Sequence, residues 1–368
     1  MSLSLEIKKF INSEHTGSYV TIMLPVIMPE EQPPAAKMRR QPKQAVHETA
    51  ASVASVLEAT AQESAGYAPL DVDEADFGAA ARPAQRDEQQ QWQQDPGFAP
   101  RVKYEATRIH YTEDGEGEPL ILVHSVGQSA YTWRKVFFQL REHYRVIAVD
   151  MPGHGYSDRP VHFDYTVDAH AMALRLFMDA MRIESAHIAG FSLGAVYALQ
   201  FALQNPMRVG KLIALTPGGV TEQMPLPVKL IDSSFFGGIA SRLYGVGTVR
   251  KLLEDCVFDL TNIDDEVVQQ YYIPASDPEG RRCIRESLHC FDEQPTLAHL
   301  RELQCPVLIL QGSEDKWHKS EDVDLFHAVI QSAGFAVIRN VGHLIHEEKP
   351  ERFVAAVLEF IPVMMPEG

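Results

Sequence analysis

Short and almost wholly apolar runs recur along the chain after about residue 100. They occupy residues 120–124, 145–150, 186–190, 211–215, 306–310 and 335–339. Runs of this kind are typical of strands that are buried on both faces of a parallel sheet, because neither face needs polar side chains. The pattern therefore predicts a central sheet that is mostly parallel.

Segments with helical spacing of apolar residues separate these runs. They occupy residues 132–143, 167–181, 193–205, 320–334 and 350–361. Repeated strand–helix alternation predicts an α/β fold with a doubly wound sheet. The stretch 106–124 begins with one more strand, which turns at the glycine-rich residues 113–118 and indicates an antiparallel start to the sheet.

One long interval breaks the alternation. Between residues 221 and 300 the sequence shows several helical patterns and no strand of the sheet. An insertion of this size between two strands is typical of an element that covers a site. We therefore expect an α/β core formed by residues 100–220 and 301–368, with residues 221–300 as a helical cap.

The first 99 residues differ in composition from the rest. They are rich in Ala, Gln, Glu and Pro, which predicts a largely disordered, low-complexity extension. Three short islands stand out: a strand at 19–28 and weak helices at 2–11 and 44–64. We expect these islands to dock on the main domain or on a partner.

Charge and cysteine content narrow the class of protein. The net charge of −17 and the pI near 5.3 argue against a nucleic-acid or anionic-membrane partner, which would favour a basic surface. The four cysteines contain no C-x-x-C pair, which indicates free thiols rather than a metal or redox site. No apolar run is long enough to span a bilayer, and we expect a cytoplasmic protein.

A serine framed by glycines stands between the predicted strand 186–190 and the predicted helix 193–205. The stretch reads Gly190-Phe191-Ser192-Leu193-Gly194. One interpretation is that Ser192 only caps the helix, since serine is favoured at that position. The other is a nucleophile elbow, in which the sharp turn exposes the hydroxyl for attack on a carbonyl. The clean strand before it and the clean helix after it favour the second interpretation.

Acid and base candidates follow later strands. Asp315 lies just past the strand 306–310, with Glu314 and Glu222 as rival acids. His343 follows the last predicted strand and precedes the last helix, with His346 as the rival base. The order Ser, Asp, His along the chain is the one expected when a nucleophile elbow serves an α/β sheet.

Oxyanion donors and pocket residues are expected beside these groups. Leu193 begins the helix and so has a backbone N–H without an internal acceptor, and Val126 in the loop after strand 120–124 is the second candidate donor. We expect Ser125, Phe191 and Trp317 to contact a substrate. Aromatic residues of the cap could line the pocket or pack on the core: Phe235, Phe236, Tyr244, Tyr271 and Tyr272.

Five motifs in order give the segment from about 102 to 362 a family resemblance. They read HSVGQSAYTW, VDMPGHGYSDRP, GFSLGA, QGSEDKW and VGHLIHEEKPERF. The segment resembles the α/β-hydrolase superfamily, in the branch of lidded serine esterases and lactonases. The resemblance implies Ser192 as nucleophile, Asp315 as acid, His343 as base, and Val126 and Leu193 as oxyanion donors, with no metal and no organic cofactor.

Residue types within these motifs indicate the reaction. Haloalkane dehalogenases and epoxide hydrolases of the superfamily carry an aspartate at the elbow, and Ser192 disfavours both. His124-Ser125 replaces the usual His-Gly, and enol-lactone hydrolases can carry a similar run. We therefore expect hydrolysis of an ester or lactone of a small, fairly hydrophobic molecule through an acyl-enzyme. A slow receptor or scaffold, an acyltransferase and a thioesterase stay open, as does the oligomeric state.

Overall fold

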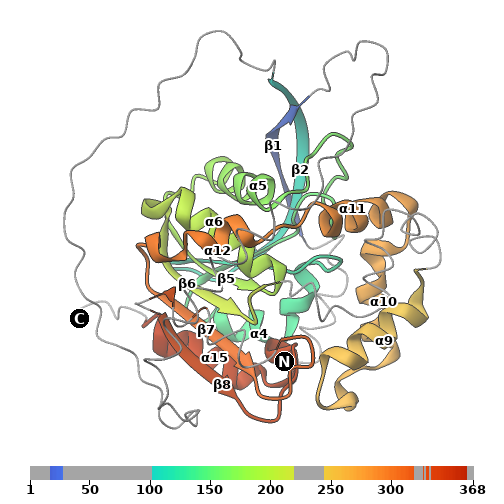
Figure 1. Cartoon of the computed structure of the whole chain (residues 1–368), viewed down its shortest axis with the longest axis vertical. Helices are drawn as coiled ribbons and strands as arrows, with labels where there is room; N and C mark the ends of the chain where they lie inside the picture. The colour runs from blue at the N-terminus through green and yellow to red at the C-terminus, as the bar shows by residue number, and fades with distance from the viewer. Residues whose placement is uncertain are drawn as a thin grey trace, which may run out of the picture.

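The described part of the chain is built around one eight-stranded sheet (Figure 1). The computed structural model describes residues 17–27, 102–218, 244–318, 326, 329–330 and 333–362. The strand order is β1-β2-β4-β3-β5-β6-β7-β8. The strands are β1 (Ser18–Ile27), β2 (Val102–Asp114), β3 (Pro119–Val123), β4 (Arg145–Val149), β5 (Ala186–Phe191), β6 (Val209–Leu215), β7 (Val307–Gly312) and β8 (Ala333–Ile338).

The predicted α/β fold is confirmed, because β3 to β8 are parallel and each coincides with an apolar run found in the sequence. β2 pairs antiparallel with β4, as the antiparallel start of the sheet predicts. β1 in turn pairs antiparallel with β2 along its whole length, from Ser18 opposite Tyr111 to Ile27 opposite Val102. The predicted strand at 19–28 is thus confirmed, and it extends the sheet into the segment expected to be an extension. The predicted helices at 2–11 and 44–64 lie outside the described residues.

Helices cover both faces of the sheet (Figure 1). On one face, α4 (Arg134–Leu140) and α15 (Pro350–Phe360) pack against strand side chains such as Leu120 and Leu122. On the other face, α5 (Val167–Ala180) and α6 (Leu193–Gln204) pack against Ile121 and Val123. Neighbouring positions on a strand point to opposite faces, so one apolar run supplies both cores. Most of the predicted helix 320–334 lies outside the described residues.

Helices also fill the interval between β6 and β7. They are α9 (Val246–Cys256), α10 (Asp265–Tyr272), α11 (Pro278–His289) and α12 (Gln294–Ala298), with 3-10 turns between them. Figure 1 shows α9, α10 and α11 grouped at one side of the sheet. Ile284 and Leu288 of α11 share an apolar cluster with Leu193 and Val196 of α6. The helical insertion therefore packs directly above the residues that follow Ser192.

A buried polar network joins α10 to the core. Tyr271 of α10 donates a hydrogen bond to the carboxylate of Glu347, which lies in α14 (Ile345–Glu348). Arg134 is paired with the same carboxylate, with 2.6 Å between its Nη2 and Oε2 of Glu347. The Oγ1 atom of Thr132 lies 2.7 Å from the Tyr271 hydroxyl. Because all four groups are buried, each polar atom needs these partners, and the network fixes where α10 sits.

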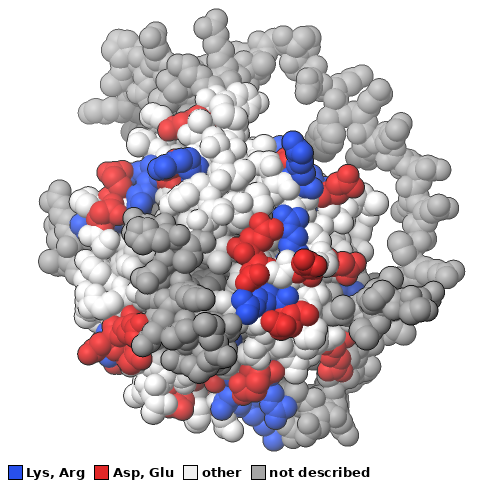
Figure 2. Space-filling model, turned by 180° about the vertical axis from the view of Figure 1, so that it is seen from behind, with Lys and Arg blue, Asp and Glu red and all other residues white. Residues whose placement is uncertain are grey.

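Exposed charges pair locally on the surface. Figure 2 shows Lys and Arg beside Asp and Glu in small mixed groups on the face opposite to the view of Figure 1. Arg108 with Asp158 and Arg141 with Asp114 are two such ion pairs among the described residues. No helix in the part of the chain that is described has the length and apolar character needed to cross a membrane. The cytoplasmic location and the lack of a nucleic-acid partner stay predictions.

The position of β1 gives a test by substitution. Leu24 is 1% exposed and belongs to the core on the α5 side of the sheet, whereas its neighbour Met23 is 48% exposed. Leu24→Ala should lower the free energy of unfolding by about 2 to 5 kcal/mol, because it leaves a cavity in that core. Met23→Ala should change it by less than about 0.5 kcal/mol. Urea denaturation followed by circular dichroism measures both, and equal effects would show that β1 does not pack as described.

Candidate active site

The turn at Ser192 has the geometry of a nucleophile elbow. Ser192 connects the end of β5 to the start of α6 with φ of 53° and ψ of −118°, a conformation that costs free energy for a residue with a side chain. Its side chain makes no capping hydrogen bond to the helix. The interpretation of Ser192 as a simple helix cap therefore does not account for the turn.

Glycines on either side make this turn possible. A Cβ atom at Gly190 would lie 2.6 Å from the Cα atom of Ala195, and one at Gly194 would lie 2.3 Å from the carbonyl oxygen of His124. Real Cβ atoms do not approach backbone so closely, so only glycine fits at either position. The close contacts bring β3, β5 and α6 together at the carboxyl edge of the sheet.

Asp315 lies just past β7 and is held as a carboxylate. Its Oδ1 accepts hydrogen bonds from the backbone N–H groups of Trp317 at 2.8 Å and His318 at 3.1 Å. Its Oδ2 accepts from Nδ1 of His343 at 2.8 Å and from the amide of Gln311 at 3.3 Å. Burial raises the pKa of Asp315, but the charge of His343 and the hydrogen bonds from His318 and His343 outweigh it and hold that pKa well below its usual range.

His343 lies in the loop after β8 and lines the same pocket as Ser192. Because a carboxylate only accepts, Nδ1 of His343 carries the proton and Nε2 carries the lone pair. Nε2 is buried and has no hydrogen-bond partner among the described residues. Burial lowers the pKa of His343, although Asp315 partly offsets the effect. The neutral ring with a free Nε2 is the form that can accept a proton near neutral pH.

One largely apolar pocket contains the predicted site. Ser192 and His343 both line it, as do the predicted oxyanion residues Val126 and Leu193. The residues expected to contact a substrate line it as well: Ser125, Phe191 and Trp317. Three cap helices supply apolar walls, including Val249, Leu252, Leu253, Tyr271, Ile284 and Leu288, and Tyr244 lies there too. These predicted residues therefore line one pocket under the cap, and Asp315 is joined to them by its hydrogen bond with His343.

The loop that carries Val126 is held by His124. Nδ1 of His124 donates to the carbonyl oxygen of Ser125 at 2.6 Å, and its Nε2 accepts from the backbone N–H of Met151 at 3.0 Å. Ser125 has no left-handed φ, so its side chain causes no backbone strain where the family usually has glycine. The departure from the usual His-Gly is therefore accommodated without distortion of this loop.

The alternative acid and base candidates have other hydrogen-bond partners, or they lie outside the described residues. His346 is turned away, with its Nε2 2.7 Å from Oγ1 of Thr132, and burial lowers its pKa to about 3. Glu314 is exposed and its carboxylate accepts from the hydroxyl of Ser313. Glu222 and the cap aromatics Phe235 and Phe236 lie outside the described residues. Tyr272 packs at the edge of the core rather than lining the pocket.

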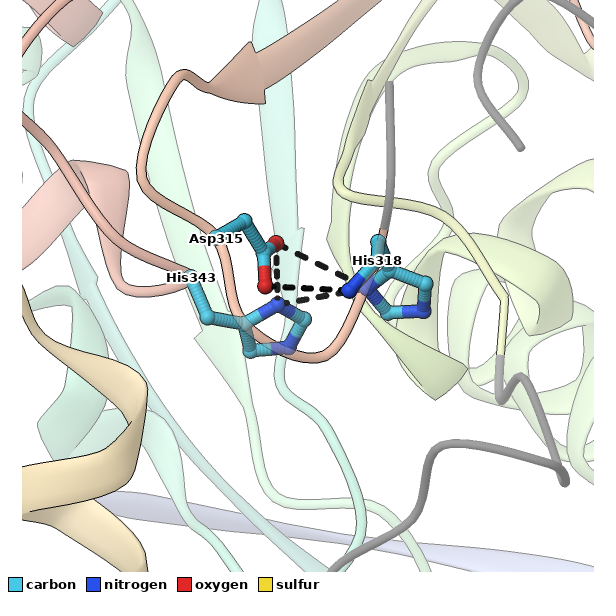
Figure 3. A group of neighbouring side chains, drawn as sticks. All are labelled: Asp315, His318 and His343. Carbon is cyan, nitrogen blue, oxygen red and sulfur yellow. Dashed lines mark hydrogen bonds and ion pairs between the residues drawn. The ribbon is translucent and has the colours of Figure 1, made fainter. Parts of the chain in front are cut away.

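His318 is a residue of this site that the sequence analysis did not single out. Its ring stacks on that of His343, with centroids 4.9 Å apart and planes 24° apart, and Trp317 also stacks on His343 at 5.2 Å. The only signal in the sequence is its place three residues after Asp315. Together Asp315, His318 and His343 form a group of side chains with the spacing to hold a metal ion, which Figure 3 shows.

Comparisons with known proteins agree with this fold. The family model of the alpha/beta hydrolase fold matches residues 118–350. The 2-hydroxy-6-oxo-6-phenylhexa-2,4-dienoate hydrolase of Comamonas testosteroni is 31% identical over 69% of this chain and 91% of its own. A 2-hydroxy-6-oxononadienedioate/2-hydroxy-6-oxononatrienedioate hydrolase of Burkholderia vietnamiensis is 32% identical with the same coverage.

A solved structure supports the same fold and the same class of enzyme. The meta-cleavage product hydrolase of Pseudomonas fluorescens superposes with a TM-score of 0.61 and 27% sequence identity, over 69% of this chain and 94% of its own. The relatives and the neighbour are hydrolases by name, and the range matched by the family model includes the helices between β6 and β7. Hydrolase activity is therefore the function that the relatives support, and the chain belongs to the α/β-hydrolase fold family.

Proposed function

We propose that the protein hydrolyses a carboxylic ester or lactone with Ser192 as nucleophile, His343 as base and Asp315 as the acid that orients the base. The observation that carries the proposal is the hydrogen bond from Nδ1 of His343 to Asp315. That bond leaves the lone pair of Nε2 free in a pocket that Ser192 also lines. A nucleophile, a base and an orienting carboxylate in this relation are the requirements of acyl transfer.

The proton moves between Ser192 and His343. As Ser192 Oγ attacks the substrate carbonyl, Nε2 of His343 accepts the hydroxyl proton, and the same proton then leaves with the alcohol. Water enters, gives its proton to Nε2 and attacks the acyl-enzyme, which frees the acid and restores Ser192. Asp315 stays ionised throughout, because its hydrogen bonds and the neighbouring histidines favour its charged form.

The backbone supplies donors for the oxyanion. Leu193 is the first residue of α6, so its N–H has no acceptor within the helix. Val126 follows β3 in the loop braced by His124, and both residues line the pocket. Two N–H groups fixed in advance stabilise the tetrahedral intermediate without reorganisation, and loss of one such donor typically costs about 100-fold to 1000-fold in rate.

A second candidate is hydrolysis of a dienoate, the activity named for the relatives. Such substrates carry a carboxylate, and a buried carboxylate needs a cation or several donors around it. None of the described residues that line the pocket is a Lys or an Arg. The walls are mainly aliphatic and aromatic, which favours an uncharged acyl group. We therefore place ester or lactone hydrolysis first.

Matched histidine variants test the assignment of the base. His343→Ala should lower kcat by about four orders of magnitude or more, because it removes the proposed acceptor of the Ser192 proton. His346→Ala should lower kcat far less, since its Nε2 faces Thr132. Turnover of p-nitrophenyl butyrate measures both rates, and circular dichroism checks that each variant is folded. A larger loss in His346→Ala would assign the base to His346.

A pair of esters tests the preference for uncharged acyl groups. p-Nitrophenyl butyrate and p-nitrophenyl hemisuccinate differ by a methyl group against a carboxylate at the end of the same chain. We expect kcat/KM to be lower for the hemisuccinate by about 100-fold, because the pocket offers its charge no described cation. Equal rates would contradict this preference. If 2-hydroxy-6-oxo-6-phenylhexa-2,4-dienoate turned over faster than either ester, the second candidate would replace the first.

A further inference from the structure

Three ligand atoms converge beside the pocket. Nδ1 of His343 lies 2.8 Å from Oδ2 of Asp315 and 3.3 Å from Nδ1 of His318, and Nδ1 of His318 lies 3.6 Å from the same Oδ2. Figure 3 shows both rings turned toward the carboxylate. The side chains of all three residues are almost completely buried. Two imidazoles and one carboxylate at such spacing are a donor set that Zn²⁺ accepts.

The spacing resembles one face of a zinc tetrahedron. Nitrogen and oxygen ligands lie about 2.0 Å from zinc, so neighbouring ligands of a tetrahedral ion lie about 3.3 Å apart. Of the three observed separations, one is shorter than that value, one matches it and one is longer. The ion needs only a small opening of the contact between His343 and Asp315 and a turn of the His343 ring toward it.

The surroundings of His318 favour ligation. Nε2 of His318 lies 3.1 Å from the carbonyl oxygen of Gly218, which can only accept, so Nε2 carries the proton of the neutral ring. The lone pair is then on Nδ1, which faces the cluster. Metal-binding histidines typically donate their second N–H to a carbonyl or carboxylate in this way. Oδ1 of Asp315 is held by two backbone N–H groups, and Oδ2 faces the cluster, where an ion would replace the proton that His343 shares with it.

The cluster can be reached from the pocket. His318 and His343 both line the cavity that contains Ser192, so an ion can enter by the path that a substrate takes. A zinc ion held by three protein ligands takes a water molecule as its fourth ligand.

We propose that Asp315, His318 and His343 form a binding site for Zn²⁺ that reversibly inhibits the enzyme. The inhibitory effect rests on the proposed function of His343 as base. When zinc takes the lone pair at Nδ1, the proton of the neutral His343 ring moves to Nε2. Nε2 then cannot accept the proton of Ser192, and Asp315 no longer orients the ring. Zinc binding and catalysis therefore exclude each other.

The test is zinc inhibition with a ring-conserving variant. Hydrolysis of p-nitrophenyl butyrate is measured against Zn²⁺ concentration, with each protein normalised to its own zinc-free rate. The wild type should be inhibited and should recover on addition of EDTA, whereas Mg²⁺ should have no effect because it prefers oxygen ligands. His318→Phe keeps a ring against His343 and removes both nitrogens. It should raise the half-inhibitory zinc concentration by at least about tenfold, since loss of even an outer partner of a ligand costs that much.

Controls separate this site from other zinc targets. Cys256 lines the same pocket, and Cys256→Ser should leave zinc inhibition unchanged. His318→Asn serves if His318→Phe does not fold. If both His318 variants keep wild-type zinc sensitivity, or if Cys256→Ser alone removes it, the proposed site is wrong.

A direct binding measurement tests the zinc site independently of the proposed function. Calorimetry on Ser192→Ala should show one Zn²⁺ bound per chain, and Ser192→Ala combined with His318→Phe should lose that binding. No binding to Ser192→Ala would overturn the zinc site. If zinc binds in the presence of His318 but leaves hydrolysis by the wild type unchanged, the metal site stands and the role of His343 as base is contradicted.

Discussion

The turn at Ser192 is possible only because two glycines let backbone segments pass at distances that any side chain would block. Gly190 admits the start of α6, and Gly194 admits the end of β3. The same contacts set Ser192 in a strained conformation and place Leu193 and Val126 along one pocket. Strain of this kind, roughly 1 to 3 kcal/mol, persists only where the surrounding packing compensates for it. Here the buried β5 and the buried first turn of α6 provide that packing.

The cap and the core meet through both apolar and ionic contacts. Apolar side chains of α11 pack on α6, and Tyr271 of α10 joins the buried pair of Arg134 and Glu347. A buried ion pair contributes little net stability, but removing one partner leaves an uncompensated charge, which makes the arrangement specific. Tyr271 also lines the pocket, so this network determines where one wall of the site stands.

His343 serves two interactions that compete. Its Nδ1 proton bonds to Asp315 in the form that catalysis needs, while the lone pair of His318 faces the same nitrogen. The stacked rings of Trp317 and His318 hold the imidazole in place. A metal cation bound by both His318 and Asp315 would determine how the His343 ring is oriented. The ability of His343 to act as a base therefore depends on whether a cation lies beside Asp315.

Local patterns predicted the fold well, and the three distant candidate site residues follow from the same predicted strands. Buried strands are continuous apolar runs, so β3 to β8 could be found one by one, and the positions of Ser192, Asp315 and His343 follow from the strands that precede them. The partner of the predicted strand at 19–28 could not be found in this way, because its pairing with β2 joins segments far apart in the chain. His318 was missed for a similar reason, since only the folded chain stacks its ring on His343. The roles of Thr132 and Glu347 could not be predicted either, because their hydrogen-bond partners lie in other elements.

The central claim is that the hydroxyl of Ser192 is the activated nucleophile of the pocket. The most direct measurement is mass spectrometry of peptides from the intact protein after reaction with a fluorophosphonate, which modifies activated serines. The account predicts a single adduct on the peptide that contains Ser192, formed slowly or not at all when His343 is replaced. An adduct on another residue, or an unmodified Ser192 in folded protein, would contradict it.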